Sequence, residues 1–229
     1  GEHLKVASLC WKMNRLRAMG LSEILWRTRK YVLGNLQKAG FGLAPQYVQP
    51  KGVEGKPWLP QWPTTLNVQS YQNAAERILG GRFTIFSLRD AHLGFPPQWN
   101  RDPLTQTDAP MVFGKSLNYR NENLVGNIKY LWEPNRHLEL TVLAQAYSLT
   151  SEDRYADGVK CLLESWFTQC PYPLGPNWIS SLEHAVRLVN WSFTWHLLGG
   201  ENGSFLARQY CKRVKLRRMH SVYQHIHFI

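Results

Sequence analysis

Four stretches in the second half of the chain repeat apolar residues at helical spacing, with only short connections between them. They span residues 136–149, 153–169, 180–198 and 204–227. In the first stretch Leu138, Val142 and Leu149 fall on one face, as an amphipathic helix requires. Short connections make neighbouring helices pack antiparallel, so we expect two αα-hairpins. This pattern predicts a mainly α fold.

The first half of the chain predicts a more irregular structure. The expected elements are helices over residues 9–19, 23–38 and 71–78, a strand over 82–86, and a long ordered loop region with short strands over 93–123. Ser22 is the expected cap of the second helix and Gly40 its stop. Five prolines between residues 43 and 63 indicate an extended connection.

Three segments follow from these patterns. Residues 1–42 form basic N-terminal helices, residues 43–126 a Pro/Gly-rich connection with short strands, and residues 127–229 a series of helical hairpins. A chain of 229 residues is long enough for one large domain or two small ones. With 44% hydrophobic and 13% aromatic residues, it does not have the composition of a disordered protein.

Positive charge is concentrated at the two ends of the chain. The formal net charge is +11, of which residues 1–39 carry +6 and residues 207–229 another +6, so the middle carries −1. Proteins that coat nucleic acids spread cations along a groove or stripe, so no nucleic-acid partner is predicted. Each basic end is either a solvated helix face or a patch for an anionic polymer.

No apolar run is long enough to cross a membrane, so no membrane partner is predicted. The N-terminus shows no signal-peptide pattern, which favours the cytoplasm, with the periplasm as the alternative if Gly1 is a processed start. The four cysteines have neither C-x-x-C nor metal-ligand spacing, so we interpret them as buried free thiols.

Polar and aromatic residues gather in four segments, which cover residues 99–105, 127–137, 175–183 and 223–227. Asn135, Arg136 and His137 lie where a loop becomes a helix, a position that favours an anion. Arg136 could bind a carboxylate through two hydrogen bonds. The alternative is structural: Asn135 only caps the helix, and Arg136 pairs with Glu133 or Glu139.

Aromatic residues at similar junctions are candidates for sugar stacking. Trp99, Trp132 and Trp178 are predicted to present exposed rings, against the alternative of core packing. Trp166, Trp191 and Trp195 lie within helical patterns and are predicted to be core. Glu183 and Arg187 are four residues apart, so they can pair on one helix face, either structurally or as the floor of a cleft.

No complete catalytic motif is present. Glu133, Glu139 and Glu183 could serve as paired carboxylates, but the sequence does not define their separation. His225 and His227 point in different directions on a helix and make a poor metal pair. Without a Gly-rich phosphate loop, G-x-S-x-G or H-E-x-x-H motif, we predict no cofactor and no metal.

Taken in order, these segments resemble the N-terminal region of the heparinase II/III-like polysaccharide lyases, a group that includes alginate lyases. The motifs are NRLRAM (14–19) with SEIL (22–25), GRFTIF (81–86), PPQWNRDPL (96–104), IKYLWEPNRH (128–137), LAQAY (143–147), ESW (164–166) and NWISSLE (177–183). The motifs cover nearly the whole chain, and IKYLWEPNRH (128–137) is the strongest of them. Pro134 and Asn127 depart from the family pattern, which more often has an aliphatic residue and an acid there.

The resemblance implies an incomplete α/α toroid of antiparallel helical hairpins, followed in the whole protein by a β-sandwich. It also implies β-elimination on acidic, uronate-containing polysaccharides. The family's catalytic Asn, His and Tyr come after the segment matching residues 224–227, so none falls in this chain. The residues matched to the substrate cleft are Trp132, Asn135, Arg136, His137, Asn177, Trp178 and Glu183.

The chain ends at Phe228-Ile229 within an apolar pattern, so we expect it to be the N-terminal part of a larger protein whose C-terminal portion is its partner. Whether residues 1–229 alone are an enzyme stays open, whereas the parent protein is expected to be a lyase. The alternative function is a non-catalytic module that binds acidic glycans.

Overall fold

The structure is a computed structural model that describes residues 14, 18–45, 59, 61–63, 65–200, 203 and 209–228. It is mainly helical with a small two-stranded sheet, which confirms the predicted class. Most of the helix predicted over 9–19 and most of the connection over 43–63 lie outside the described residues. The chain divides into two compact units, Gly1–Leu43 and Ala44–Ile229.

The first unit contains helix α2, Leu21–Lys38. It begins after Gly20, so Ser22 lies inside the helix and its predicted role as the cap is wrong. The predicted stop is confirmed, because Gly40 follows the C-cap residue in a left-handed conformation with φ 91°, which glycine adopts at little cost. Arg27 pairs with Glu23 at 2.7 Å along the helix surface.

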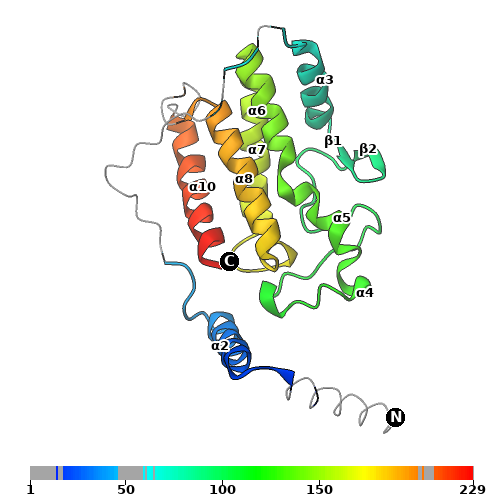
Figure 1. The fold of residues 1–229 in the computed structure, drawn as a ribbon. Helices are drawn as coiled ribbons and strands as arrows, with labels where there is room; N and C mark the ends of the chain where they lie inside the picture. Colours follow the sequence, from blue (N-terminus) through cyan, green and yellow to red (C-terminus); the bar gives the residue numbers. More distant parts are fainter. Residues whose placement is uncertain are drawn as a thin grey trace, which may run out of the picture. The chain divides into compact units, whose positions relative to one another are not determined.

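In the second unit four helices of the described chain lie side by side (Figure 1): α6 (Leu138–Thr150), α7 (Asp153–Gln169), α8 (Ser181–Leu197) and α10 (Gln209–Phe228). Helix α6 packs against α7 and α8, and α10 packs against the same two helices. Only two residues connect α6 to α7, so α7 runs back along α6 as predicted.

A helix and a hairpin precede this bundle. Helix α3 (Val68–Leu79) packs on α6, and strands β1 (Arg82–Ile85) and β2 (Leu88–His92) pair antiparallel. Phe83 and Ile85 of β1 are buried while Arg82 and Thr84 face outward, which is the alternation expected of a half-buried strand. Strand β1 was predicted from the sequence, and β2 was not.

The long loop region of the second unit is ordered and folds back onto the helices. It carries two isolated bridges, Arg101 with Asp108 and Phe113 with Leu174, and the turn η1 (Gly114–Ser116). The buried carboxylate of Asp102 accepts hydrogen bonds from the backbone N–H of Leu104 and Asn127. Three short helical segments then lead into the bundle: α4 (Glu122–Val125), α5 (Ile128–Trp132) and η2 (Pro134–Arg136).

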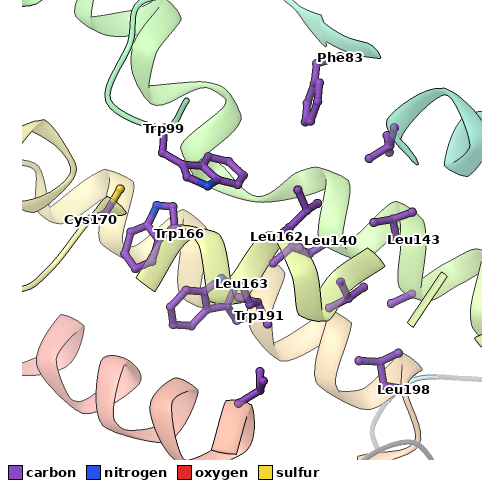
Figure 2. Close-up of a cluster of buried hydrophobic side chains, with 14 of the residues drawn as sticks. Phe83, Trp99, Leu140, Leu143, Leu162, Leu163, Trp166, Cys170, Trp191 and Leu198 are labelled. Atoms are coloured by element: carbon purple, nitrogen blue, oxygen red, sulfur yellow. The ribbon is translucent and has the colours of Figure 1, made fainter. Parts of the chain in front are cut away.

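One main core joins this loop region to the bundle. Figure 2 shows Phe83 and Trp99 facing side chains of the helices such as Leu140, Trp166 and Trp191. A smaller cluster forms under α4 and α5 around Leu117, Val125 and Leu131. None of the described helices is long and apolar enough to cross a membrane.

Candidate functional site

Residues of three motifs, 96–104, 128–137 and 177–183, meet at the end of the bundle where α8 begins. Ser180 caps α8 by accepting the backbone N–H of Glu183. The turn η3 (Pro176–Trp178) lies just before this cap, and it packs against α5 and η1. Residues that are distant in the sequence therefore share one region of the surface and of the core beneath it.

Arg136 is at the centre of a three-residue ion-pair network. Its Nε and Nη2 bind the two carboxylate oxygens of Glu183 at 2.8 and 3.0 Å, and its Nη1 binds Glu133 at 2.7 Å. The pKa of Arg136 is raised, chiefly by the hydrogen bonds to Glu183. The alternative prediction, that Arg136 pairs with Glu133, is confirmed. Glu183 binds Arg136 rather than Arg187, so the predicted pairing of Glu183 with Arg187 on one face of α8 is wrong.

Trp132 is a partly exposed aromatic residue of this region. Its Nε1–H donates to the carbonyl of Pro176 at 2.9 Å, which ties α5 to η3. Its ring lies 5.7 Å from the ring of Tyr119, centre to centre, and is only partly buried. Trp132 and Arg136 are thus the two predicted binding residues that reach solvent.

The other five predicted binding residues are buried: Asn135, His137, Asn177, Trp178 and Glu183. The prediction that Trp99 and Trp178 present exposed rings is wrong, since each is at most 2% exposed. Both belong to irregular segments that fold back onto the helices, where periodicity carries no information about burial. Trp166 and Trp191 are core as predicted. These buried residues can support a binding surface but cannot contact a polymer directly.

Asn135 connects three parts of the fold. Its Nδ2 donates to the carbonyls of Trp99 and Leu131 at 2.8 Å each, and its Oδ1 accepts the Nε1–H of Trp166 at 2.9 Å. The residue that caps α6 is His137, with φ 63°, so the proposed capping role of Asn135 is wrong. Asn177 acts similarly, donating to Asn100 Oδ1 at 3.1 Å.

His137 is a buried, neutral ring. Its Nδ1 accepts the Nε1–H of Trp191 at 2.7 Å, and the two rings stack with an interplanar angle of 20°. Burial, assisted by the nearby charge of Arg187, lowers the pKa of His137 well below 6.5. The ring therefore stays uncharged near neutral pH, so it does not supply positive charge for an anion.

The sequence pattern did not reveal the buried pair Arg187 and His225. Arg187 is fully buried, and it donates from Nε to the carbonyl of Asn135 at 2.7 Å and from Nη1 to His225 Nε2 at 2.8 Å. His225 Nδ1 in turn lies 2.6 Å from the carbonyl of Ser221, which assigns its proton to Nδ1. These partners come from different helices, so helical spacing within α8 could not identify them.

Arg187 carries a buried charge that is bound by no carboxylate of the described residues. Its Nη2 has no hydrogen-bond partner among them, and its guanidinium lies 4.7 Å from the centre of the Trp166 ring. Burial lowers its pKa to about 10, which still leaves it protonated at neutral pH. The same environment lowers the pKa of His184 to about 3, because burial and the charge of Arg187 disfavour a second cation.

Among the described residues, no group of three His, Cys, Asp or Glu side chains could hold a metal ion. Cys161 and Cys170 are free thiols, and burial raises the pKa of Cys170 to about 12, so it is not a thiolate nucleophile.

No protein-family model, no curated protein and no solved structure matches this chain.

Proposed function

We propose that this chain is the N-terminal part of a heparinase II/III-like polysaccharide lyase, in which its hairpins begin an α/α toroid. One observation carries the proposal: three of the motifs that resemble the family, residues 96–104, 128–137 and 177–183, contact one another directly. Arg136 binds Glu183 and Asn135 binds the carbonyl of Trp99, while Trp132 binds the carbonyl of Pro176 just before the third motif. Motifs that serve a common site are expected to converge in this way.

The proposed reaction is β-elimination on a uronate-containing polysaccharide. Neutralising the uronate carboxylate makes the C5 proton removable, and an acid–base pair then moves protons to and from the leaving oxygen. The catalytic Asn, His and Tyr are expected downstream of residue 227, and this chain would supply part of the cleft wall. Trp132 could stack on a sugar ring there.

Arg136 has a restricted role in this scheme. Together with Glu133 and Glu183 it forms a group with net charge −1, and the two carboxylates use three of its five N–H donors. The net negative charge opposes a further anion, so Arg136 binds a substrate carboxylate best when one of the two glutamates withdraws. Glu133 is the candidate, because it makes a single bond and is 25% exposed, whereas Glu183 makes two bonds and is 4% exposed.

The test compares the 229-residue chain with a longer protein encoded by the same reading frame. We expect the longer protein to release unsaturated uronate products, detected by their ultraviolet absorbance, and the short chain to release none. Trp132→Ala in the longer protein should lower kcat/KM about tenfold through lost stacking. A frame that lacks the catalytic residues, or full activity in the short chain, would contradict the proposal.

The second candidate, a non-catalytic acidic-glycan-binding module, also draws on the partly exposed ring of Trp132. Isothermal titration of the short chain with uronate oligosaccharides separates the two. Binding by the short chain, combined with a longer protein that has no lyase activity on any uronate polymer, would favour the module.

A further inference from the structure

A cleft of about 400 Å³ opens to solvent between α7 and α10, away from the Arg136 network. Trp166, Cys170 and Trp178 form its floor, and the half-buried rings of Phe167 and Tyr172 stand beside it. Its volume lies within the range of about 300–1,000 Å³ that is typical of small-ligand sites. The cleft thus offers aromatic surface at the scale of a sugar ring.

The opposite wall is polar and basic. Helix α10 contributes Arg217, His220 and Gln224, and none of the described residues that line the cleft is acidic. The whole of α10 contains no Asp or Glu. The guanidinium of Arg217 lies 5.4 Å from the centre of the Phe167 ring, so a basic and an aromatic group stand close together. A ligand with a negative charge and a ring would match this combination.

A second positive charge lies behind the floor. The guanidinium of Arg187 is 4.7 Å from the centre of the Trp166 ring, and no carboxylate in the described part of the chain binds it. In a low-dielectric interior such a charge is poorly screened, so its potential extends into the cleft. The two arginines therefore favour an anion from two directions.

We propose that this cleft binds one acidic sugar ring, a uronate unit of the polymer that the protein acts on. The inference rests on the proposed function for the class of ligand. Arg217 binds the carboxylate, Gln224 binds hydroxyl groups, and the rings of Phe167 and Tyr172 pack against the apolar face of the sugar. Neither Trp132 nor Arg136 lines the cleft, so it would hold a different sugar unit from theirs.

The experiment is isothermal titration of the 229-residue chain with a uronate tetrasaccharide and with its carboxyl-reduced analogue. Arg217→Gln should weaken binding of the acidic ligand about tenfold, because it removes one charge-assisted contact. Arg213→Gln is the matched control, since Arg213 is exposed on the same helix and does not line the cleft. Circular dichroism and thermal unfolding check that both variants fold.

Three outcomes would overturn the proposal: no binding by the unaltered chain, equal binding of the reduced analogue, or equal losses in the two variants. The lyase assay on the longer protein is a separate measurement. If the two variants lose affinity equally while the longer protein is active, the proposed binding of a uronate unit in the cleft is refuted and the proposed function stands. If the cleft binds the acidic ligand as expected and the longer protein is inactive, the proposed function fails alone.

Discussion

At the scale of single residues, the buried amide of Asn135 connects three segments of the site. It satisfies two backbone carbonyls and the indole N–H of Trp166, all in the interior. Buried polar groups are stable only when they are paired. The indole N–H of Trp166 therefore depends on Asn135, whereas the carbonyl of Trp99 also accepts a longer bond of 3.5 Å from Asn177. The role of Asn135 is therefore structural, and it determines how the 99–105 segment lies against α5 and α7.

We predict that Asn135→Ala lowers the free energy of unfolding by about 2–4 kcal/mol, because it leaves buried donors and acceptors unsatisfied. Urea unfolding followed by tryptophan fluorescence measures the loss. Asn118→Ala is the control; Asn118 is exposed, and the change there should stay within about 0.5 kcal/mol. Equal losses in the two variants would show that water replaces the amide of Asn135.

Glu139 is a second residue with a measurable effect, in this case on how stability depends on pH. It lines a hollow of about 170 Å³ between α3, β1 and α6, and its buried Oε2 has no hydrogen-bond partner among the residues that the structure describes. Burial raises the pKa of its carboxyl from 4.5 to about 7. The pKa of Glu139 is higher in the folded chain than in the unfolded chain. Its contribution to the free energy of unfolding is therefore fully present below pH 4.5 and is lost as the pH rises through about 7.

Glu139→Gln should therefore gain stability relative to the unaltered chain as the pH rises through this range, by at most about 3 kcal/mol. Denaturant unfolding at a series of pH values measures the difference. Buried neutral histidines such as His184 act in the opposite direction, but they are common to both proteins and cancel. Glu122→Gln, at an exposed position, is the control. A pH-independent difference for Glu139→Gln would contradict the assignment.

At the scale of elements, the contact between η1 and η3 depends on the absence of a side chain. Gly114 donates its N–H to the carbonyl of Pro173 at 3.0 Å, and a Cβ at this position would overlap the backbone carbonyl of Trp178. Backbone cannot move aside as a flexible side chain can. The two turns must therefore separate if any larger residue replaces this glycine.

Gly114→Ala should lower the free energy of unfolding by about 1–3 kcal/mol through this overlap. Gly34→Ala is the opposite case, because Gly34 lies within α2 with open space around it, and alanine there should favour the helix by about 1 kcal/mol. Thermal unfolding and far-ultraviolet circular dichroism test both variants. A Gly114→Ala protein as stable as the unaltered chain would contradict the steric argument.

The helices were more predictable than the connections between them. Apolar periodicity predicts α7 at both ends and α8 within one residue of each end, because these helices bury one face along their length. The segment forming β2, Leu88–His92, has no β-branched residue and takes its structure from pairing with β1. Within the site, Arg136 and Glu183 are 47 residues apart, so local spacing could not reveal their bond.

At the scale of the whole molecule, the main hydrophobic core belongs to one unit. Its buried members run from Ala75 to Phe228, and they come from the loop region as well as from the helices. The described part of the first unit contributes none of them, and α2 has no buried residue. Since buried apolar area supplies most of the stabilisation of a domain, the second unit contains what it needs to fold.

We predict that residues 44–229 alone fold with the same helical signal per residue in the second unit and with a midpoint of thermal unfolding within about 2 °C of the full chain. Calorimetry and circular dichroism measure both. The comparison is a chain that ends before α10, which lacks the core residues Val214 and Phe228 and should unfold at a clearly lower temperature. If removing residues 1–43 lowers the midpoint as much as removing α10, the first unit contributes to the stability of the second, and the core is not self-sufficient.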